Sequence, residues 1–179
     1  MAKVSIIGTG TWGIALGMVL AQNGHEVTAW SALPKEIEAL KESYKCKNLP
    51  GVEIPRSIVF TADLQEACTD KEMLVLSVPS VFTRGVAKQM NPFIKEGQLI
   101  VSVAKGIEEK TLMTMSQQIE QELPMANVAV LSGPSHAEEV SRGIPTTVVV
   151  GAKDRQTAEH IQNLFMSSVF RVYTSPDIL

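Results

Sequence analysis

Short apolar runs alternate with longer helical segments along most of the chain. The first run, Val4–Ile7, ends in a glycine-rich turn, and a small-residue helical segment follows it. Strands that are buried on both faces read as unbroken apolar runs, and their alternation with helices is typical of a parallel sheet. The pattern therefore predicts an α/β fold of the Rossmann-like, doubly wound type, with a mostly parallel sheet of about eight strands and helices on both faces.

The apolar runs and the segments between them give approximate bounds for these elements. We place the strands at Lys3–Gly8, Glu26–Trp30, Ile58–Thr61, Met73–Val78, Leu99–Val103, Val128–Leu131, Thr146–Val150 and Phe170–Tyr173. We place the helices near Thr11–Asn23, Pro34–Tyr44, Leu64–Cys68, Thr83–Met90, Glu108–Leu123, Ala137–Ser141 and Arg155–Phe165. Pro34 fits a first helical position and Asp154 fits an N-cap. Residues 46–55 form the longest irregular stretch, which is either a loop beside a ligand crevice or an ordinary connection.

Length and composition limit the class of protein. A chain of 179 residues, of which 45% are hydrophobic, can bury one sizeable core as a single domain. The net charge of −3 and the lack of a basic stripe argue against a nucleic-acid partner. Two cysteines and three scattered histidines form neither a disulfide framework nor a zinc spacing. We therefore expect a reduced, cytoplasmic protein without a metal site.

The uncharged run from Val4 to Asn23 has a second interpretation, as the core of a signal peptide. Four glycines and two threonines dilute its hydrophobicity, and no clear cleavage site follows it. We therefore expect a buried strand and helix here, and no stable insertion into a membrane.

The glycine-rich turn carries the clearest candidate chemistry. Gly8, Gly10 and Gly13 have the spacing of a dinucleotide-binding fingerprint, in which they allow a tight turn, close approach of a pyrophosphate, and close packing of helix on strand. Thr11 and Trp12 enter the helix, whose free N–H groups can bind phosphate. We expect these five residues to contact a dinucleotide.

The end of the second strand leaves the choice of dinucleotide open. NAD-binding Rossmann domains usually place an acidic residue at this point to bind the ribose hydroxyls. This chain has Ser31 and Ala32 instead. Ser31 and Lys35 are candidates to receive a 2′-phosphate, but no arginine supports that interpretation. The cofactor is therefore expected to be NAD or NADP.

The later strand ends carry further candidates, because ligands of doubly wound sheets lie across the carboxyl ends of the strands. Pro79 and Phe82 follow the fourth strand, and Phe82 is placed to cover a nicotinamide ring or to join the core. Lys105 follows the fifth strand. A cation at this point could give electrostatic assistance to a reaction at a carbonyl group, although a solvated lysine is the plain alternative.

Gly133 and Ser135 follow the sixth strand. Ser135 and Glu138 have the spacing of a capping box, so Ser135 is expected to cap a short helix whose start can also bind substrate oxygens. His136 lies beside them, and a lone histidine without a visible partner is more often structural than catalytic.

Taken in order, these motifs resemble the N-terminal domain of bacterial NAD(P)-dependent glycerol-3-phosphate dehydrogenases. The resemblance rests on the residues Gly8–Gly13, Gly24–Val27, Val78–Ser80, Ala104–Gly106, Ser132–Ser135 and Phe170–Asp177. Two positions depart from the family's habit: Ala32 replaces a basic or aromatic residue, and Asn48 replaces an aromatic one.

The resemblance implies reversible hydride transfer between NAD(P)H and dihydroxyacetone phosphate, giving sn-glycerol 3-phosphate for phospholipid synthesis. It implies cofactor contacts from Thr11, Trp12, Lys105 and Ala137, and substrate contacts from Lys105, Gly133 and Ser135. Residues 1–179 would form the dinucleotide-binding domain, and a helical domain with the general acid/base lysine would follow Leu179. The oligomeric state is open, with a homodimer as the candidate assembly of the full-length protein.

Two alternatives remain at this stage. One is a domain of a related two-domain enzyme of the β-hydroxyacid dehydrogenase or ketopantoate reductase type. The other is a dinucleotide-sensing module that has no catalytic activity.

Overall fold

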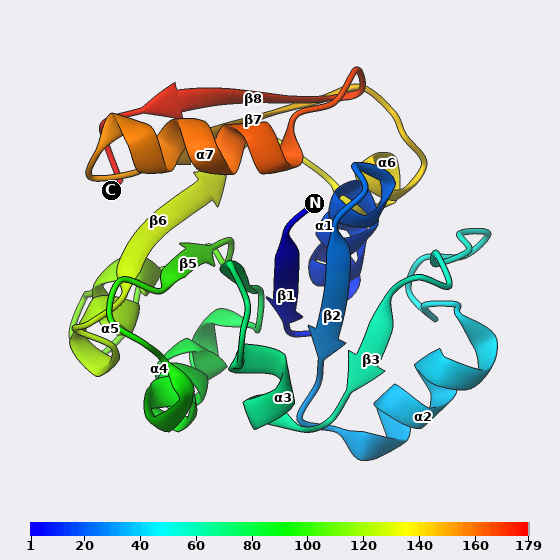
Figure 1. The fold of residues 1–179 in the computed structure, drawn as a ribbon, viewed down its shortest axis with the longest axis horizontal. Helices are drawn as coiled ribbons and strands as arrows, with labels where there is room; N and C mark the ends of the chain where they lie inside the picture. The colour runs from blue at the N-terminus through cyan, green and yellow to red at the C-terminus, as the bar shows by residue number, and fades with distance from the viewer. Residues whose placement is uncertain (179) are drawn as a thin grey trace.

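Eight strands form one sheet in the order β3-β2-β1-β4-β5-β6-β7-β8 in the computed structural model, which describes residues 1–178 (Figure 1). The strands are β1 Lys3–Ile7, β2 Glu26–Trp30, β3 Val59–Thr61, β4 Met73–Leu76, β5 Leu99–Ser102, β6 Asn127–Ser132, β7 Thr146–Gly151 and β8 Phe170–Ser175. The helices are α1 Thr11–Gln22, α2 Pro34–Ser43, α3 Leu64–Cys68, α4 Ser80–Met90, α5 Met115–Glu122, α6 Ala137–Ser141 and α7 Arg155–Phe165, with a 3₁₀ turn at Asn91–Phe93. The predicted fold class is confirmed.

The strand order reverses between β1 and β4. Both strands pair in parallel, and the chain leaves β1 toward β2 on one side and β4 toward β5 on the other. Only β6 and β7 pair antiparallel among the described strands. A ligand of such a sheet binds outside the carboxyl ends of the strands at the reversal point. The topology therefore directs attention to the loops that follow β1 and β4.

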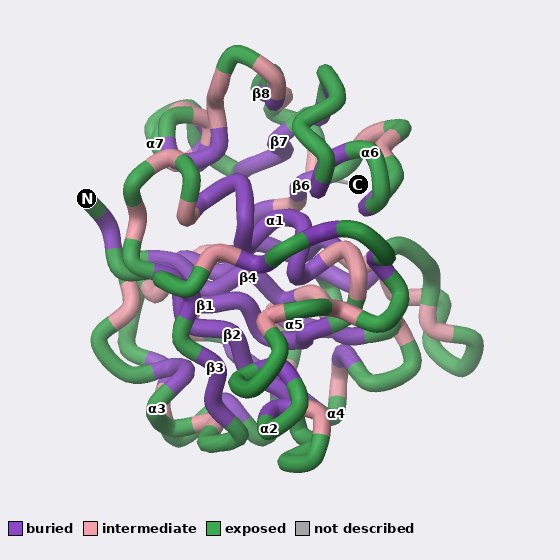
Figure 2. The backbone as a smooth tube through the Cα atoms, turned by 90° about the vertical axis from the view of Figure 1, so that its right-hand side faces the viewer, coloured by how far each residue is buried: buried purple, intermediate pink, exposed green. Residues whose placement is uncertain are grey.

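Two apolar cores lie on the two faces of the sheet. One contains side chains of α1, α2, α6 and α7, and the other contains side chains of α3, α4 and α5. Figure 2 shows the central strands as the most buried part of the backbone, surrounded by exposed loops and helix surfaces. Helix α1 is buried continuously from Gly13 to Leu20 and packs beside α6. The start of α1 is thereby held firmly at the end of β1.

The last two strands are covered by a helix on one face only. Residues alternate between buried and exposed along β7 and β8, and Val149 and Tyr173 are 40% and 60% exposed. Helix α7 covers the buried side (Figure 1). Alternation of this kind is typical of a sheet with one solvated face. Helices therefore cover both faces of the central strands but leave the outer face of β7 and β8 open.

The predicted helix at 108–123 is wrong over its first seven residues. Helix α5 begins at Met115, and Leu112 has a φ of +59°, which interrupts any helix that passes through it. Thr114 is the N-cap: its hydroxyl accepts a hydrogen bond from the backbone N–H of Gln117, whose side chain accepts one from the N–H of Thr114. This capping box stabilises the later start.

Replacing Thr114 by alanine is expected to lower the free energy of unfolding by about 1 kcal/mol, because the N–H of Gln117 then loses its acceptor. Urea denaturation measures the change. Thr114→Ser retains the hydroxyl and is the matched control, for which we expect a much smaller loss. Equal losses for the two variants would show that the methyl group, rather than the cap, carries the effect.

The start of one other helix also differs from the prediction. Helix α4 begins at Ser80, three residues earlier than expected, directly after Pro79. The irregular stretch 46–55 packs Leu49, Val52 and Ile54 into the core. As predicted, Pro34 starts α2 and Asp154 caps α7. No helix among residues 1–178 is long and apolar enough to cross a membrane.

Candidate functional site

The glycine-rich turn joins β1 to α1 in a very confined space. Gly8 has a φ of +121°, and a Cβ atom on it would lie 2.8 Å from the backbone nitrogen of Val78. A Cβ on Gly13 would overlap the carbonyl oxygen of Gly8 and lie 2.5 Å from Oγ of Ser77. L side chains rarely adopt the first conformation, and nothing larger than hydrogen fits at the second position. Gly8 and Gly13 therefore allow α1 to start against the ends of β1 and β4.

Gly10 differs from these two glycines. It is the N-cap of α1, no side chain caps the helix, and a Cβ on Gly10 would meet no protein atom within 4 Å. The N–H groups of the first helical turn, at Thr11 and Trp12, therefore have no side-chain acceptor. Helix N-termini of this kind bind anions through free N–H groups and the positive end of the helix dipole.

A cavity of about 390 Å³ lies where the carboxyl ends of β1, β4 and β5 meet. It is lined by Gly10, Thr11, Trp12, Ser77, Val78, Pro79, Ser80, Val103, Ala104, Lys105 and Ser135. The structure thus brings together six of the predicted site residues, from four separate strand ends. Lys105 is the one charged side chain among these lining residues. The cavity offers apolar walls, an uncapped helix start and a single cation.

Lys105 is exposed, and its ammonium group is hydrogen-bonded at the border of this cavity. Its Nζ donates a hydrogen bond to the carbonyl oxygen of Gly133, at 2.9 Å. The hydroxyl of Ser135 donates to the same oxygen, at 3.4 Å. Lysine has three donor hydrogens, so two remain for a ligand. Lys105, Gly133 and Ser135 therefore form one group, as their predicted shared role requires.

The predicted capping box at Ser135 is wrong. Helix α6 begins at Ala137, so His136 occupies the N-cap position, and no side chain caps the helix. Ser135 lies one residue too early to reach the helical N–H groups, and its hydroxyl bonds to Gly133 instead. His136 is exposed at the surface.

Six predicted cofactor residues are not among the residues that line the cavity: Gly8 and Gly13, which shape the turn beside it, and Ser31, Ala32, Phe82 and Ala137. Ser31 and Ala32 follow β2, on the far side of the glycine turn. Phe82 is 60% exposed on the first turn of α4, so it is not a core residue. Ala137 is buried at the start of α6, which packs against α1. Phe82 and Ala137 border loops of the cavity, while Ser31 and Ala32 mark a separate region.

Ser77 is a site residue that the sequence interpretation missed. Its hydroxyl donates to the carbonyl oxygen of Gly8, at 2.8 Å, and so ties the end of β4 to the glycine turn. The predicted strand extended to Val78, which hid Ser77 inside it. A polar residue that directly follows the apolar run Met73–Leu76 is the signal that could have found it.

An ion-pair cluster holds the loop that begins at Lys105. Arg84 of α4 donates from Nε and Nη2 to the two carboxylate oxygens of Glu108, at 2.8 and 2.7 Å, and from Nη1 to Glu122 at 2.8 Å. Glu108 also accepts from the hydroxyl of Thr111. A two-pronged pair of this kind has strong geometric specificity. It fixes the loop only three residues beyond Lys105.

This cluster predicts a dependence of stability on pH. The hydrogen bonds from Arg84, with a further one from Thr111, lower the pKa of Glu108 from 4.5 to about 2. A carboxylate with a lowered pKa in the folded state stabilises the fold above its unfolded pKa, and this contribution is lost as the pH falls toward the folded value. The contribution of Glu108 is therefore lost between about pH 4.5 and about pH 2.

Arg84→Gln is expected to remove this contribution, so its deficit in urea midpoint relative to the unchanged chain is largest at about pH 6 and shrinks at about pH 3. Lys88→Gln on the same helix makes the same charge change at an exposed residue and is the control. A deficit of Arg84→Gln that stays constant over this pH range would contradict the assignment.

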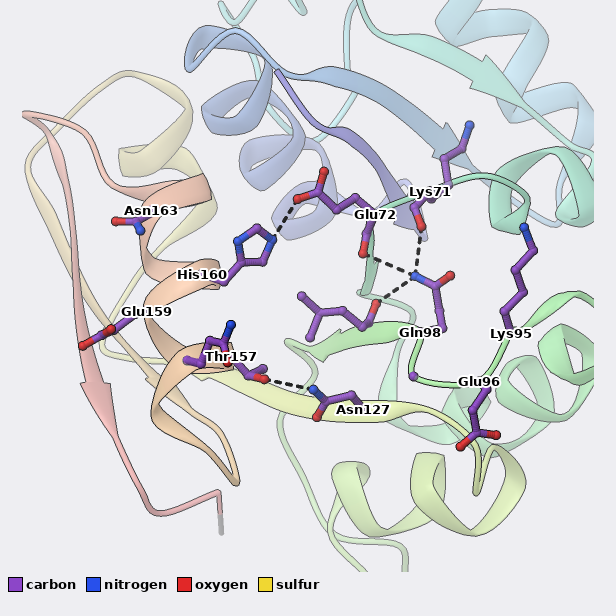
Figure 3. Close-up of a pocket in the computed structure, with 13 residues that line it drawn as sticks. Lys71, Glu72, Lys95, Glu96, Gln98, Asn127, Thr157, Glu159, His160 and Asn163 are labelled. Carbon is purple, nitrogen blue, oxygen red and sulfur yellow. Dashed lines mark hydrogen bonds and ion pairs between the residues drawn. The ribbon is translucent and has the colours of Figure 1, made fainter.

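A larger cleft of about 670 Å³ lies at the opposite edge of the sheet (Figure 3). Its residues precede β4 and β5, begin β6, or belong to α7, so it faces the amino ends of the parallel strands. Many of its polar groups bond to one another: His160 lies 2.8 Å from Glu72, and Asn127 donates to Thr157 at 2.9 Å. Ligands of doubly wound sheets bind at the other edge, so size alone does not make this cleft the site.

The described residues contain no group of three or more His, Cys, Asp or Glu side chains that could hold a metal ion.

Comparison with known proteins decides the family. The sequence profile described as "NAD-dependent glycerol-3-phosphate dehydrogenase N-terminus" matches residues 3–158. The chain belongs to this family. The matched range includes the glycine turn, Lys105 and Gly133.

Relatives of the family match the chain over its whole length. It is 60% identical to glycerol-3-phosphate dehydrogenase [NAD(P)+] of Agathobacter rectalis and 52% identical to that of Fusobacterium nucleatum, and it covers 54% of each relative. The crystal structure of glycerol-3-phosphate dehydrogenase from Coxiella burnetii superposes with a TM-score of 0.92 at 27% identity, over 99% of this chain and 55% of that one. The chain spans about half the length of these relatives.

Proposed function

We propose that this chain is the cofactor-binding half of a glycerol-3-phosphate dehydrogenase, acting on dihydroxyacetone phosphate and sn-glycerol 3-phosphate. The bond between Lys105 and Gly133, across a cavity that the uncapped start of α1 also lines, is the observation that carries the proposal. The bond supports the proposal because it holds a cation near the uncapped helix start, at the reversal point of the sheet where ligands of this fold class bind. The names of the relatives supply the substrate.

In this proposal the first turn of α1 binds the pyrophosphate of the dinucleotide through the N–H groups of Thr11 and Trp12. NADH or NADPH, when bound, supplies the hydride. The ammonium group of Lys105, oriented by the carbonyl oxygen of Gly133, donates a hydrogen bond toward the ketone oxygen. A positioned cation of this kind stabilises the negative charge that develops on that oxygen. Ser135 and Gly133 border the place where the substrate binds.

The remaining length of the relatives is proposed to supply the general acid/base lysine and most of the phosphate contacts. A general acid must lie within hydrogen-bond reach of its target, so the 179-residue chain alone is expected to bind dinucleotide and show negligible turnover. The proposed setting is the cytoplasm, and a homodimer is the proposed assembly of the full-length enzyme.

A fusion to the C-terminal half of the Agathobacter rectalis enzyme tests this proposal. The 60% identity between that relative and this chain favours a compatible interface between the two halves. We expect the fusion to oxidise NADH only when dihydroxyacetone phosphate is present, and the chain alone to bind NADH without turnover. Activity with ketopantoate instead would favour the related dehydrogenases. Binding without any turnover in a folded fusion would favour a dinucleotide-sensing module.

A further inference from the structure

A carboxylate from α2 is fixed at the end of β2. Ser31, which is 6% exposed, donates from its hydroxyl to Oε2 of Glu36 at 2.6 Å and accepts from the backbone N–H of Leu33 at 3.2 Å. Glu36 lies in the first turn of α2, so its side chain reaches back to the strand end. No acidic residue directly follows β2 in the sequence, but the fold brings the carboxylate of Glu36 to this strand end.

This carboxylate lies beside the glycine turn. The N–H of Gly8 donates to the carbonyl oxygen of Trp30, at 2.9 Å, and Ser31 is the next residue. In Rossmann domains an acidic residue at the end of β2 usually binds the ribose hydroxyls of NAD. Glu36 brings the same group to the same strand end from the following helix.

The neighbouring strand end repeats the arrangement. Thr61, which ends β3, donates from its hydroxyl to Oε2 of Glu66 at 2.5 Å. The two strand ends are joined, because the N–H of Ser31 donates to the carbonyl oxygen of Thr61 at 3.3 Å. Lys35 is the cation next to Glu36, and it is exposed. Two hydrogen-bonded carboxylates, half-buried Glu36 and exposed Glu66, therefore lie at the ends of β2 and β3.

We propose that Glu36, aided by Glu66, makes this chain select NAD(H) over NADP(H). A carboxylate accepts hydrogen bonds from free ribose hydroxyls, but it repels the added negative charge of a 2′-phosphate. Ser31 donates its hydroxyl hydrogen to Glu36 and cannot donate it to a phosphate at the same time. This inference rests on the proposed function, in that the dinucleotide must bind at the carboxyl edge of the sheet.

Dissociation constants of NADH and NADPH for the 179-residue chain test the proposal. We expect NADH to bind about tenfold more tightly or better. Glu36→Gln keeps an acceptor for Ser31 but removes the charge, and it should reduce the preference by about fivefold, chiefly by tightening NADPH. Glu38→Gln changes the same charge two residues away, where side chains do not share a helix face, and should leave the ratio unchanged.

Glu66→Gln is a second test variant, which remains informative if Glu36→Gln does not fold. It should reduce the preference for NADH over NADPH to a smaller extent than Glu36→Gln does. Equal affinity of the unchanged chain for NADH and NADPH would overturn the inference while leaving the proposed function intact. So would an unchanged ratio in folded Glu36→Gln. Failure of the chain to bind either nucleotide would overturn the proposed function itself.

Discussion

Substitution of Gly13 by alanine is expected to lower the free energy of unfolding by about 3 kcal/mol or more and to abolish NADH binding. The added methyl group would overlap the carbonyl oxygen of Gly8 and press on Oγ of Ser77. Since the opposing atom belongs to the backbone of the turn after β1, no side-chain rotation relieves the overlap. Helix α1 would have to move away from the sheet, and the cavity wall would move with it.

Alanine substitutions at two other glycines, Gly85 and Gly10, are the comparison variants for Gly13→Ala. Gly85→Ala lies in the exposed middle of α4 with open space around its Cβ, and it should raise stability by up to about 1 kcal/mol. Gly10→Ala also meets no protein atom, so stability should change by less than about 1 kcal/mol, whereas NADH should bind about tenfold more weakly. Urea denaturation and NADH titration separate the three variants. A stable Gly13→Ala protein that binds NADH normally would contradict the proposed packing.

Replacing Lys105 by methionine is expected to lower the turnover of the active fusion by about 100-fold or more. Methionine keeps the length and the apolar stem but removes the charge that the bond to Gly133 orients. The dissociation constant of NADH should change by less than about threefold, since the proposed pyrophosphate contacts lie at α1. The expected loss therefore falls on the chemical step rather than on cofactor binding.

Lys110→Met is the matched control, because it makes the same change at an exposed residue of the same loop. Its turnover should remain within about twofold of the unchanged fusion. Lys105→Arg keeps the charge and should recover part of the lost rate. If Lys105→Met turned over as fast as Lys110→Met, the bond to Gly133 would be structural and the assigned role of Lys105 would be wrong.

The sheet could be predicted because its strands are unbroken apolar runs, and because glycines with the right spacing follow the first of them. The same logic located Lys105 and Gly133, which both follow strands that end at one edge. Local signals were less reliable. Thr114 caps α5 through Gln117, three residues further along the chain. The residue types before Thr114 did not indicate an irregular segment. Only the structure shows that Leu112 adopts a positive φ, which ends any helix there.

The end of β2 shows what a strand-by-strand interpretation cannot find. From the sequence, Glu36 is interpreted as a solvated helix residue, since four residues lie between it and Ser31, and Lys35 and Glu38 are close to it in sequence. Only the turn between β2 and α2 brings its carboxylate to the hydroxyl of Ser31. Ser135 shows the reverse error, because its capping-box spacing with Glu138 pointed to a cap one residue before the N-cap position that His136 occupies.

A crystal structure of the chain with NADH tests the central claim most directly, because the two edges of the sheet offer separate cavities. We predict that the pyrophosphate lies on the N–H groups of Thr11 and Trp12, with the nicotinamide toward Lys105 and the adenosine ribose toward Glu36. A nucleotide bound instead in the cleft beside His160 and Glu72, at the amino edge of the sheet, would contradict the account.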